Sequence, residues 1–207
     1  RNPSLISSRR ERGSVYRCLE QYSLAKIDLD AVLQQDPNDL EAHLQRAFLS
    51  IEQEEFEPAF ADLRYAERHG MKDPYLLLNL AYVHFRLGRV SEALSVNERL
   101  IREFPGKLHA MALLQQGVLL MASGRSDAAR LALAEGQRLA EQDKNLASIE
   151  DAIDELERLQ TQYAIHKNVA EPSRMSLQRA REHLRAQPGL VKHRCHNWDN
   201  SVRRGFE

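Results

Sequence analysis

Histidine and cysteine near the C-terminus are the first side chains whose spacing suggests chemistry. His193, Cys195 and His196 lie within four positions, and imidazole and thiolate are ligands that zinc prefers. A structural zinc site needs four ligands. No second Cys or His pair lies at finger-like spacing, and Cys18 is far away in the sequence. We therefore interpret the triplet as part of a solvated tail, and the sequence predicts no metal site and no cofactor.

Clustered carboxylates are the other candidates for chemistry. Glu52, Glu54, Glu55 and Glu57 gather at a predicted helix–helix turn, where acidic side chains are solvated and favoured by the start of the next helix. The chain has no G-x-S-x-G, no phosphate-binding glycine loop and no H-E-x-x-H. The sequence therefore predicts no catalytic residue and a protein that is not an enzyme.

The last stretch mixes basic and aromatic residues. Its predicted anchors are Trp198, Arg203, Arg204 and Phe206. Such mixtures stack on nucleic acid or anchor protein interfaces. The whole chain carries 29 basic and 30 acidic residues, which gives no general argument for nucleic acid. We therefore favour a tail that contacts a neighbouring protein.

A repeated pattern along the chain must position these groups. Ala25, Ala59 and Ala93 recur at one constant interval, and Ala129 follows after an interval that is longer by two. A large residue precedes the first three alanines by three positions: Tyr22, Phe56 and Val90. A small residue precedes all four by twelve: Gly13, Ala47, Ala81 and Gly117. Small residues at fixed intervals indicate places where two helices cross closely.

The segment Asp73–Pro105 shows one unit of this repeat. It reads as two amphipathic helices joined at Leu87-Gly88-Arg89. Neither helix can bury its apolar stripe alone, so copies of the pair are expected to stack on one another.

These features resemble the tetratricopeptide repeat (TPR) family, whose period is about 34 residues. The resemblance covers roughly residues 5–142 and includes the prolines that close two repeats, Pro37 and Pro105. The repeats are degenerate, because the family's bulky aromatic early in each first helix is replaced by Arg9, His43, Leu77 and Leu113. The resemblance implies an all-α fold, a right-handed α-solenoid of helix hairpins with a C-terminal capping helix and an extended tail.

The predicted organisation has four parts. Residues 1–8 are an N-terminal lead-in, residues 9–142 hold four TPR-like repeats, residues 146–187 hold capping helices, and residues 188–207 form the basic tail. The first capping helix runs over 146–166, and a second opens at Glu171-Pro172-Ser173.

The resemblance also implies a partner-binding groove lined by the first helix of each pair. The groove-facing positions here are Arg10, Ser14, Arg17, Gln45, Phe48, Glu52, Asn79, Tyr82, Arg86, Gln115 and Met121. Their aromatic and amide groups suit an extended peptide or a helix, although the same residues also fit an ordinary solvated or partly packed face. Some family members bind the terminal carboxylate of a chaperone, and we reject that binding mode for this chain. Only Arg10 is charged among the matching positions, which are Arg10, Ser14, Gln45, Tyr75 and Asn79.

We expect an adaptor or scaffold that joins proteins within a large intracellular assembly. The alternative is an RNA-associated subunit of a ribonucleoprotein that uses the five arginines of residues 1–17 and the tail, and a third reading is a self-associating module whose tail fills its own groove. Two distant cysteines favour a reducing compartment, cytoplasmic or cytoskeletal and ciliary, with an organelle also open. The chain has no run of 18 apolar residues, so the sequence predicts no membrane span. The start at Arg1 suggests that the chain is the ordered part of a longer protein.

Overall fold

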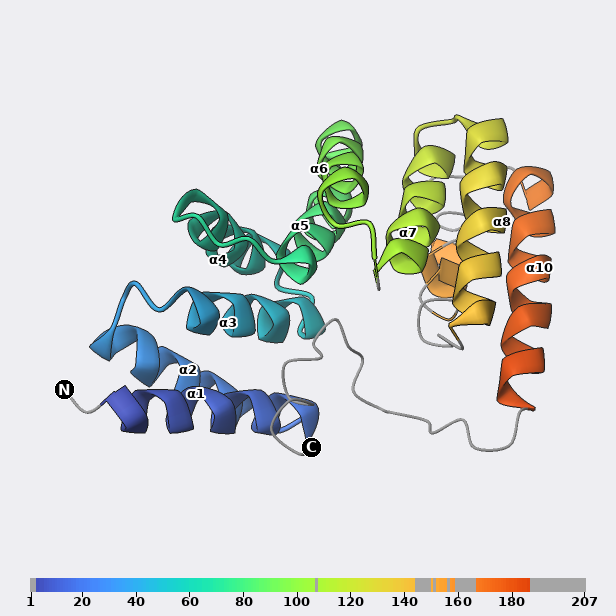
Figure 1. Ribbon diagram of the computed structural model, residues 1–207. Coiled ribbons are helices and arrows are strands. Elements are labelled where there is room, and N and C mark those ends of the chain that lie inside the picture. Colours follow the sequence, from blue (N-terminus) through green and yellow to red (C-terminus); the bar gives the residue numbers. More distant parts are fainter. Residues whose placement is uncertain are drawn as a thin grey trace. The chain divides into compact units, whose positions relative to one another are not determined.

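The computed structural model describes residues 3–106, 108–143, 150, 152–155, 157–158 and 167–186. The described chain divides after Leu87 into two compact units. The N-terminal unit holds helices α1 to α5, and the C-terminal unit holds α6, α7, α8 and α10 (Figure 1). The described residues contain no strand.

The N-terminal unit is an array of helix hairpins. Its helices are α1 (Pro3–Cys18), α2 (Tyr22–Gln35), α3 (Leu40–Glu52), α4 (Phe56–Arg68) and α5 (Pro74–Arg86). Each helix packs on the next along the chain, and α1 also contacts α3, while α3 contacts α5. The first helices therefore form a row of neighbours, as the repeat pattern predicts.

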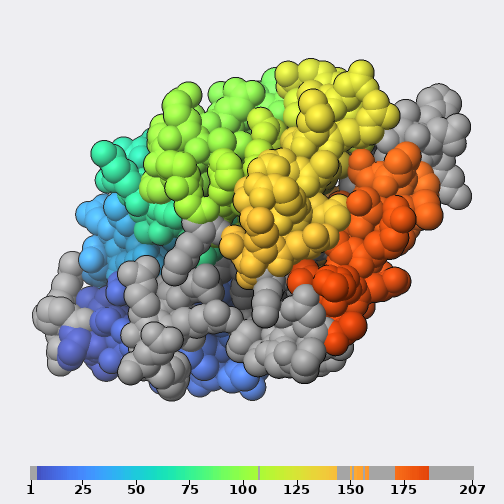
Figure 2. Space-filling model, turned by 45° about the vertical axis from the view of Figure 1, so that its right-hand side comes forward, coloured from blue at the N-terminus to red at the C-terminus, as the bar shows by residue number. Residues whose placement is uncertain are grey.

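The C-terminal unit continues the hairpin pattern. It comprises α6 (Val90–Glu103), α7 (His109–Ala122), α8 (Ser126–Gln142) and α10 (Lys167–Arg185). Helix α7 packs on α6 and α8, and α10 lies along α8 (Figures 1 and 2). The second helices begin at Tyr22, Phe56, Val90 and Ser126. These are the positions three before the recurring alanines, so the predicted repeat spacing is confirmed, including the longer last interval.

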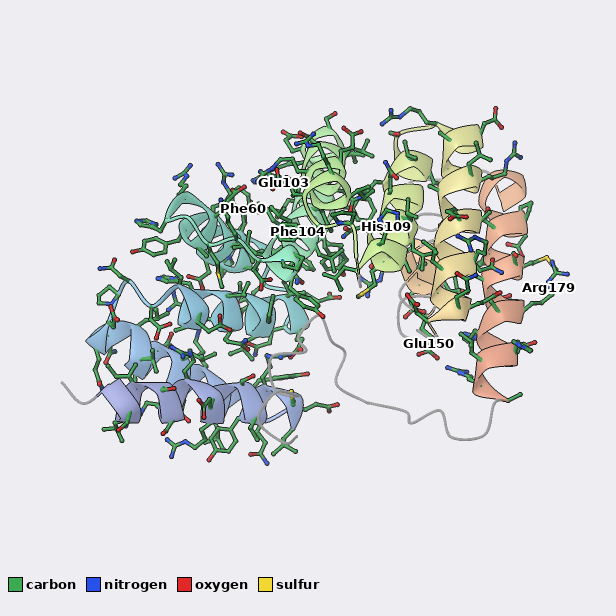
Figure 3. All side chains as sticks on the ribbon, in the orientation of Figure 1. Phe60, Glu103, Phe104, His109, Glu150 and Arg179 are labelled. Atoms are coloured by element: carbon green, nitrogen blue, oxygen red, sulfur yellow. The ribbon has the colours of Figure 1, made fainter. Side chains whose placement is uncertain are left out.

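Two helix starts differ from the sequence-based expectation. Helix α1 begins at Pro3, so most of the expected lead-in of residues 1–8 is helical; proline suits this first position because its missing N–H has no partner in the first turn anyway. Helix α10 begins at Lys167 and holds Pro172 inside, not at its start. Its Leu177, Ala180 and Leu184 are buried, whereas Arg179 lies on the face turned away from α8 (Figure 3).

The first capping helix is described only in part. Residues 150, 152–155 and 157–158 are helical, and Ala152 and Ile153 are buried. The rest of the predicted 146–166 helix lies outside the described residues. Among the helices that are described, none is long and apolar enough to cross a membrane.

Each hairpin turns at a residue in the left-handed backbone region. The four residues are Glu20, Glu54, Gly88 and Gly124, with φ of 59°, 59°, 76° and 78°. At the first turn, the Gln21 N–H donates to the Tyr16 carbonyl at 2.8 Å and the Glu20 N–H to the Arg17 carbonyl at 2.9 Å. This is the Schellman geometry, in which glycine is favoured because a side chain is strained there.

Replacing Glu20 with glycine should therefore stabilise the protein. We expect a gain of about 1 kcal/mol in the free energy of unfolding, the usual scale of left-handed strain in a residue with a side chain. Urea denaturation measures the change. Gly88→Ala should shift the midpoint the opposite way, and Gly106→Ala, which lies outside this backbone region with nothing near its Cβ, should leave it unchanged. A loss of stability in Glu20→Gly would contradict the strain argument.

Small residues are buried at the recurring repeat positions, and two glycines lie where α7 and α8 meet. Ala25, Ala59, Ala93 and Ala129 are fully buried. A Cβ built on Gly117 would lie 2.4 Å from Leu133 Cγ, and one built on Gly136 would lie 2.9 Å from the backbone nitrogen of Leu114. Helices α7 and α8 therefore approach too closely to accept even a methyl group at these two points.

A buried charge network ties the second hairpin to the first. Asp62 of α4 accepts hydrogen bonds from His43 Nδ1 at 2.7 Å and from Arg46 Nε at 2.8 Å, and Arg46 Nη1 reaches Asp30 of α2 at 2.9 Å. His43 Nε2 lies 3.0 Å from the Pro37 carbonyl oxygen. Because both ring nitrogens of His43 face acceptors, the geometry favours the doubly protonated imidazolium.

The network should make stability depend on pH. Burial lowers the pKa of His43, but the hydrogen bonds to Asp62 and the Pro37 carbonyl outweigh it and raise the pKa above the ordinary 6.5. Burial raises the pKa of Asp62, but Arg46 and His43 outweigh it and lower the pKa below 3.8. Because the pKa of His43 is higher in the folded protein, its protonated ring stabilises the fold below pH 6.5. This stabilisation is lost as pH rises through the folded-state pKa. Because the pKa of Asp62 is lower in the folded protein, its carboxylate stabilises the fold above pH 3.8. This stabilisation is lost as pH falls through the folded-state pKa.

Thermal melting of wild type and His43→Gln between pH 5 and pH 9 tests the histidine's part. The stability difference between the two proteins should be greatest near pH 5 to 6 and should shrink as pH rises. A difference that is constant across this range would show that folding does not raise the pKa of His43.

Candidate functional site

Nine of the predicted groove residues lie on the three neighbouring first helices of the N-terminal unit. We call this set the first-helix row: Arg10, Ser14 and Arg17 on α1, Gln45, Phe48 and Glu52 on α3, and Asn79, Tyr82 and Arg86 on α5. Gln115 and Met121 lie on α7 in the other unit. The contacts of α1 with α3 and of α3 with α5 bring the nine together.

The row is more buried than a freely solvated face. Its buried members are Ser14, Arg17, Gln45, Phe48 and Asn79. Arg10, Glu52, Tyr82 and Arg86 are partly exposed. On α7, Met121 is buried and Gln115 is partly exposed. That these residues contact a partner stays a prediction.

An ion pair joins α1 to α3 within the row. Arg17 donates from Nη1 to Glu52 Oε1, and the Arg17 side chain is 2% exposed while that of Glu52 is 16% exposed. The Arg17 guanidinium carbon lies 5.7 Å from the centre of the Phe48 ring. Charges removed from water must be paired to persist, so this pair fixes the position of both side chains.

A second arginine cluster joins α5 to the turn of the preceding hairpin. The Arg86 guanidinium carbon lies 4.3 Å from the Phe56 ring centre, and its Nη1 donates to the Tyr82 hydroxyl at 2.6 Å. Its Nη2 lies 3.6 Å from Glu54 Oε1. Sequence reasoning identified Phe56 as one of the recurring large residues and missed its contact with Arg86. The signal was its place three residues before Ala59, where a large side chain recurs.

Among the described residues, the buried side chains of Asn79 and Ser14 each hold a polar atom without a hydrogen-bond partner. Asn79 is fully buried, and its Nδ2 donates to the Tyr75 carbonyl at 2.8 Å, but its Oδ1 accepts no hydrogen bond. The hydroxyl of Ser14 is likewise without a partner. A buried unsatisfied acceptor is costly and calls for an explanation.

The N-terminal arginines are engaged by carboxylates. Arg10 Nη1 lies 2.6 Å from Asp39 Oδ2, and Asp39 also caps α3 by accepting from the Ala42 N–H. Arg12 and Arg9 pair with Asp28. The one charge available for a terminal carboxylate is thus already neutralised, which agrees with rejecting that binding mode.

The described residues hold no group of His, Cys, Asp and Glu that fits a metal ion. The predicted tail anchors, Trp198, Arg203, Arg204 and Phe206, lie outside the described residues, as do His193, Cys195 and His196.

Family comparison decides what the hairpin array is. A family model described as tetratricopeptide repeat matches residues 51–107 and 78–144. Residues 51–144 consist of tetratricopeptide repeats. TPR proteins are generally non-catalytic and bind peptides and other proteins. A comparison with curated protein sequences gives no match.

Solved TPR structures share this fold at low sequence identity. PilF of Pseudomonas aeruginosa superposes with a TM-score of 0.65 at 15% identity, over 88% of this chain and 77% of PilF. PilW, a type IV pilus biogenesis factor, gives 0.61 at 18% identity, over 90% and 93% of the two chains. YrrB, a TPR protein with an unusual peptide-binding site, gives 0.58 at 17% identity, over 86% and 91%. At these identities the likeness shows the fold alone.

Proposed function

We propose that this protein is a non-enzymatic adaptor that binds a segment of a partner protein along its first-helix row. The observation that carries the proposal is the partly exposed cluster of Arg86, Tyr82 and Phe56, in which the Arg86 guanidinium carbon lies 4.3 Å from the Phe56 ring centre and 5.6 Å from the Tyr82 ring centre. Aromatic rings and an arginine on one partly exposed surface suit a polypeptide, because tyrosine, phenylalanine and arginine are enriched in protein interfaces.

The wider role is an interaction subunit of a large intracellular assembly. YrrB's described peptide-binding site and PilW's described part in pilus biogenesis are properties of those proteins, and they support peptide binding and assembly as uses of this fold. The tail anchors Trp198 and Phe206 would contact a neighbouring subunit.

Photo-crosslinking in native extract tests the proposal. A benzoylphenylalanine replaces Tyr82, which is partly exposed in the row, and in a matched control it replaces Leu131, which is 74% exposed on α8. We expect one crosslinked protein at position 82 that is absent at position 131. A third probe at position 198 asks whether the tail meets a second protein.

The outcomes separate the adaptor from its rival. Equal crosslinking at positions 82 and 131, or none at 82, would contradict binding at the row. Crosslinks to RNA whose yield falls steeply with salt would favour a ribonucleoprotein subunit. Two of the arginines that this rival would use are already occupied, since Arg10 pairs with Asp39 and the buried Arg17 pairs with Glu52.

A further inference from the structure

Each internal first helix buries one face against the second helix of the preceding hairpin. On α3 this face includes Ala42, which packs with Val32, and Leu49, which packs with Ala25 and Leu29 of α2. In the following repeats, the residues equivalent to Ala42 and Leu49 are Leu76 and Val83 on α5 and Ala112 and Leu119 on α7. All of these residues are at most 1% exposed.

Helix α1 exposes the corresponding face. Counting back one repeat from Ala42 and Leu49 gives Ser8 and Val15. Ser8 is exposed, Val15 is 39% exposed, and Leu19, one helical turn further on, is 60% exposed. Together with Arg12, these residues form a stripe along α1, which we call the N-terminal stacking face.

On the N-terminal stacking face, within the part of the chain that the structure describes, Arg12 lacks the carboxylate that its counterpart Arg46 receives from the preceding second helix. In the second hairpin, Arg46 uses Nε and Nη2 to hold Asp62 of its own hairpin, and Nη1 to hold Asp30 of the preceding second helix. Arg12, one repeat earlier, uses the same Nε and Nη2 to hold Asp28 at 2.6 and 2.7 Å. Its Nη1 has no partner among the described residues, and its side chain is 56% exposed. The position of the cross-junction carboxylate is therefore open.

We propose that the N-terminal stacking face docks a helix of a partner protein that carries an apolar stripe and a carboxylate directed at Arg12. The model for this helix is α2, which presents Ala25, Leu29 and Val32 to α3 and extends Asp30 to Arg46. The face is separate from the first-helix row. Its partner is selected by shape at Val15 and by charge at Arg12.

A second copy of this chain fits the face poorly. Two copies that met through their stacking faces would place Arg12 against its own counterpart, and like charges there repel. Stacking head to tail would need a free second helix at the C-terminal end, but α8 is covered by α10. A partner helix with an acidic residue has neither difficulty.

A labelled peptide with the α2 sequence, residues 22–35, serves as the probe. A staple between positions 23 and 27, which are both exposed in α2, keeps it helical without touching its apolar stripe. Fluorescence anisotropy then measures its binding to the full chain. We expect Val15→Asp to weaken binding at least about tenfold, because it replaces an apolar contact with a charge. The Asp30→Asn peptide should bind about two- to fivefold more weakly, as a partly exposed ion pair is lost.

The matched control on the protein is Ile27→Asp, which adds the same charge at an exposed apolar residue of α2 outside the face. It should leave binding unchanged, and circular dichroism should show both variants folded. No binding by wild type overturns the proposal, and so does equal binding by Val15→Asp, which would mean that the peptide replaces the chain's own α2. Sedimentation that shows a dimer broken by Val15→Asp would assign the face to a second copy and also overturn it.

Discussion

Asp62→Ala should lower the free energy of unfolding by about 3 kcal/mol, the cost of breaking a buried ion pair by removing one partner. Asp62 is 6% exposed and accepts hydrogen bonds from both His43 and Arg46. Its loss leaves an imidazolium and a guanidinium close together in the space between α3 and α4. Urea denaturation measures the change, and the slope of the transition should be unaltered.

An exposed pair supplies the control for this prediction. Glu135 and Arg138 on α8 form a two-pronged pair at 2.6 and 2.8 Å, but both side chains are about half exposed. Glu135→Ala should leave the midpoint within error, because exposed ion pairs contribute little. Equal effects for Asp62→Ala and Glu135→Ala would mean that the Asp62 network is solvated in solution.

Alanine in place of Gly117 or Gly136 should destabilise the protein by about 2 kcal/mol. Overpacking a crossing costs up to about 3 kcal/mol, and the better helix propensity of alanine returns about 1 kcal/mol. The Cβ of residue 117 would lie within 3.1 Å of three Leu133 atoms, one of them the backbone nitrogen. Helices α7 and α8 would have to move apart.

Gly13 offers a matched comparison at the same repeat position. A Cβ there would lie 3.1 Å from Leu29 Cγ, so Gly13→Ala should cost less than Gly117→Ala. If a melting temperature rose in Gly117→Ala, as helix propensity alone predicts, the close approach of α7 and α8 would be wrong. Gly117→Ala combined with Leu133→Ala should lose less stability than the sum of the two, since the second change removes the clash.

The sequence predicted the hairpins well because their signals are local. The turns at Glu20, Glu54, Gly88 and Gly124 and the buried Ala25, Ala59, Ala93 and Ala129 follow from spacing alone. It failed at Pro172, where packing of Leu177 and Leu184 against the rest of the unit outweighs a proline's preference for a helix start.

The candidate site was predicted less completely. The repeat register named the residues of the first-helix row, because the position of a residue within a hairpin decides which face it occupies. It did not reveal the pairing of Arg17 with Glu52 or the contact of Arg86 with Phe56. The members of each pair are far apart in the sequence, and only the packing of neighbouring hairpins brings them together.

The sequence by itself determined the length of each hairpin, its turns and its crossing points, since each depends on residue type at a fixed interval. Tertiary structure alone decided which charges are neutralised and which face is left uncovered, because both depend on what the neighbouring hairpin supplies. Arg46 and Arg12 occupy equivalent positions, yet among the described residues only Arg46 meets a carboxylate of a preceding second helix, Asp30. That difference in neighbours is the basis for the proposed docking of a partner helix at Arg12.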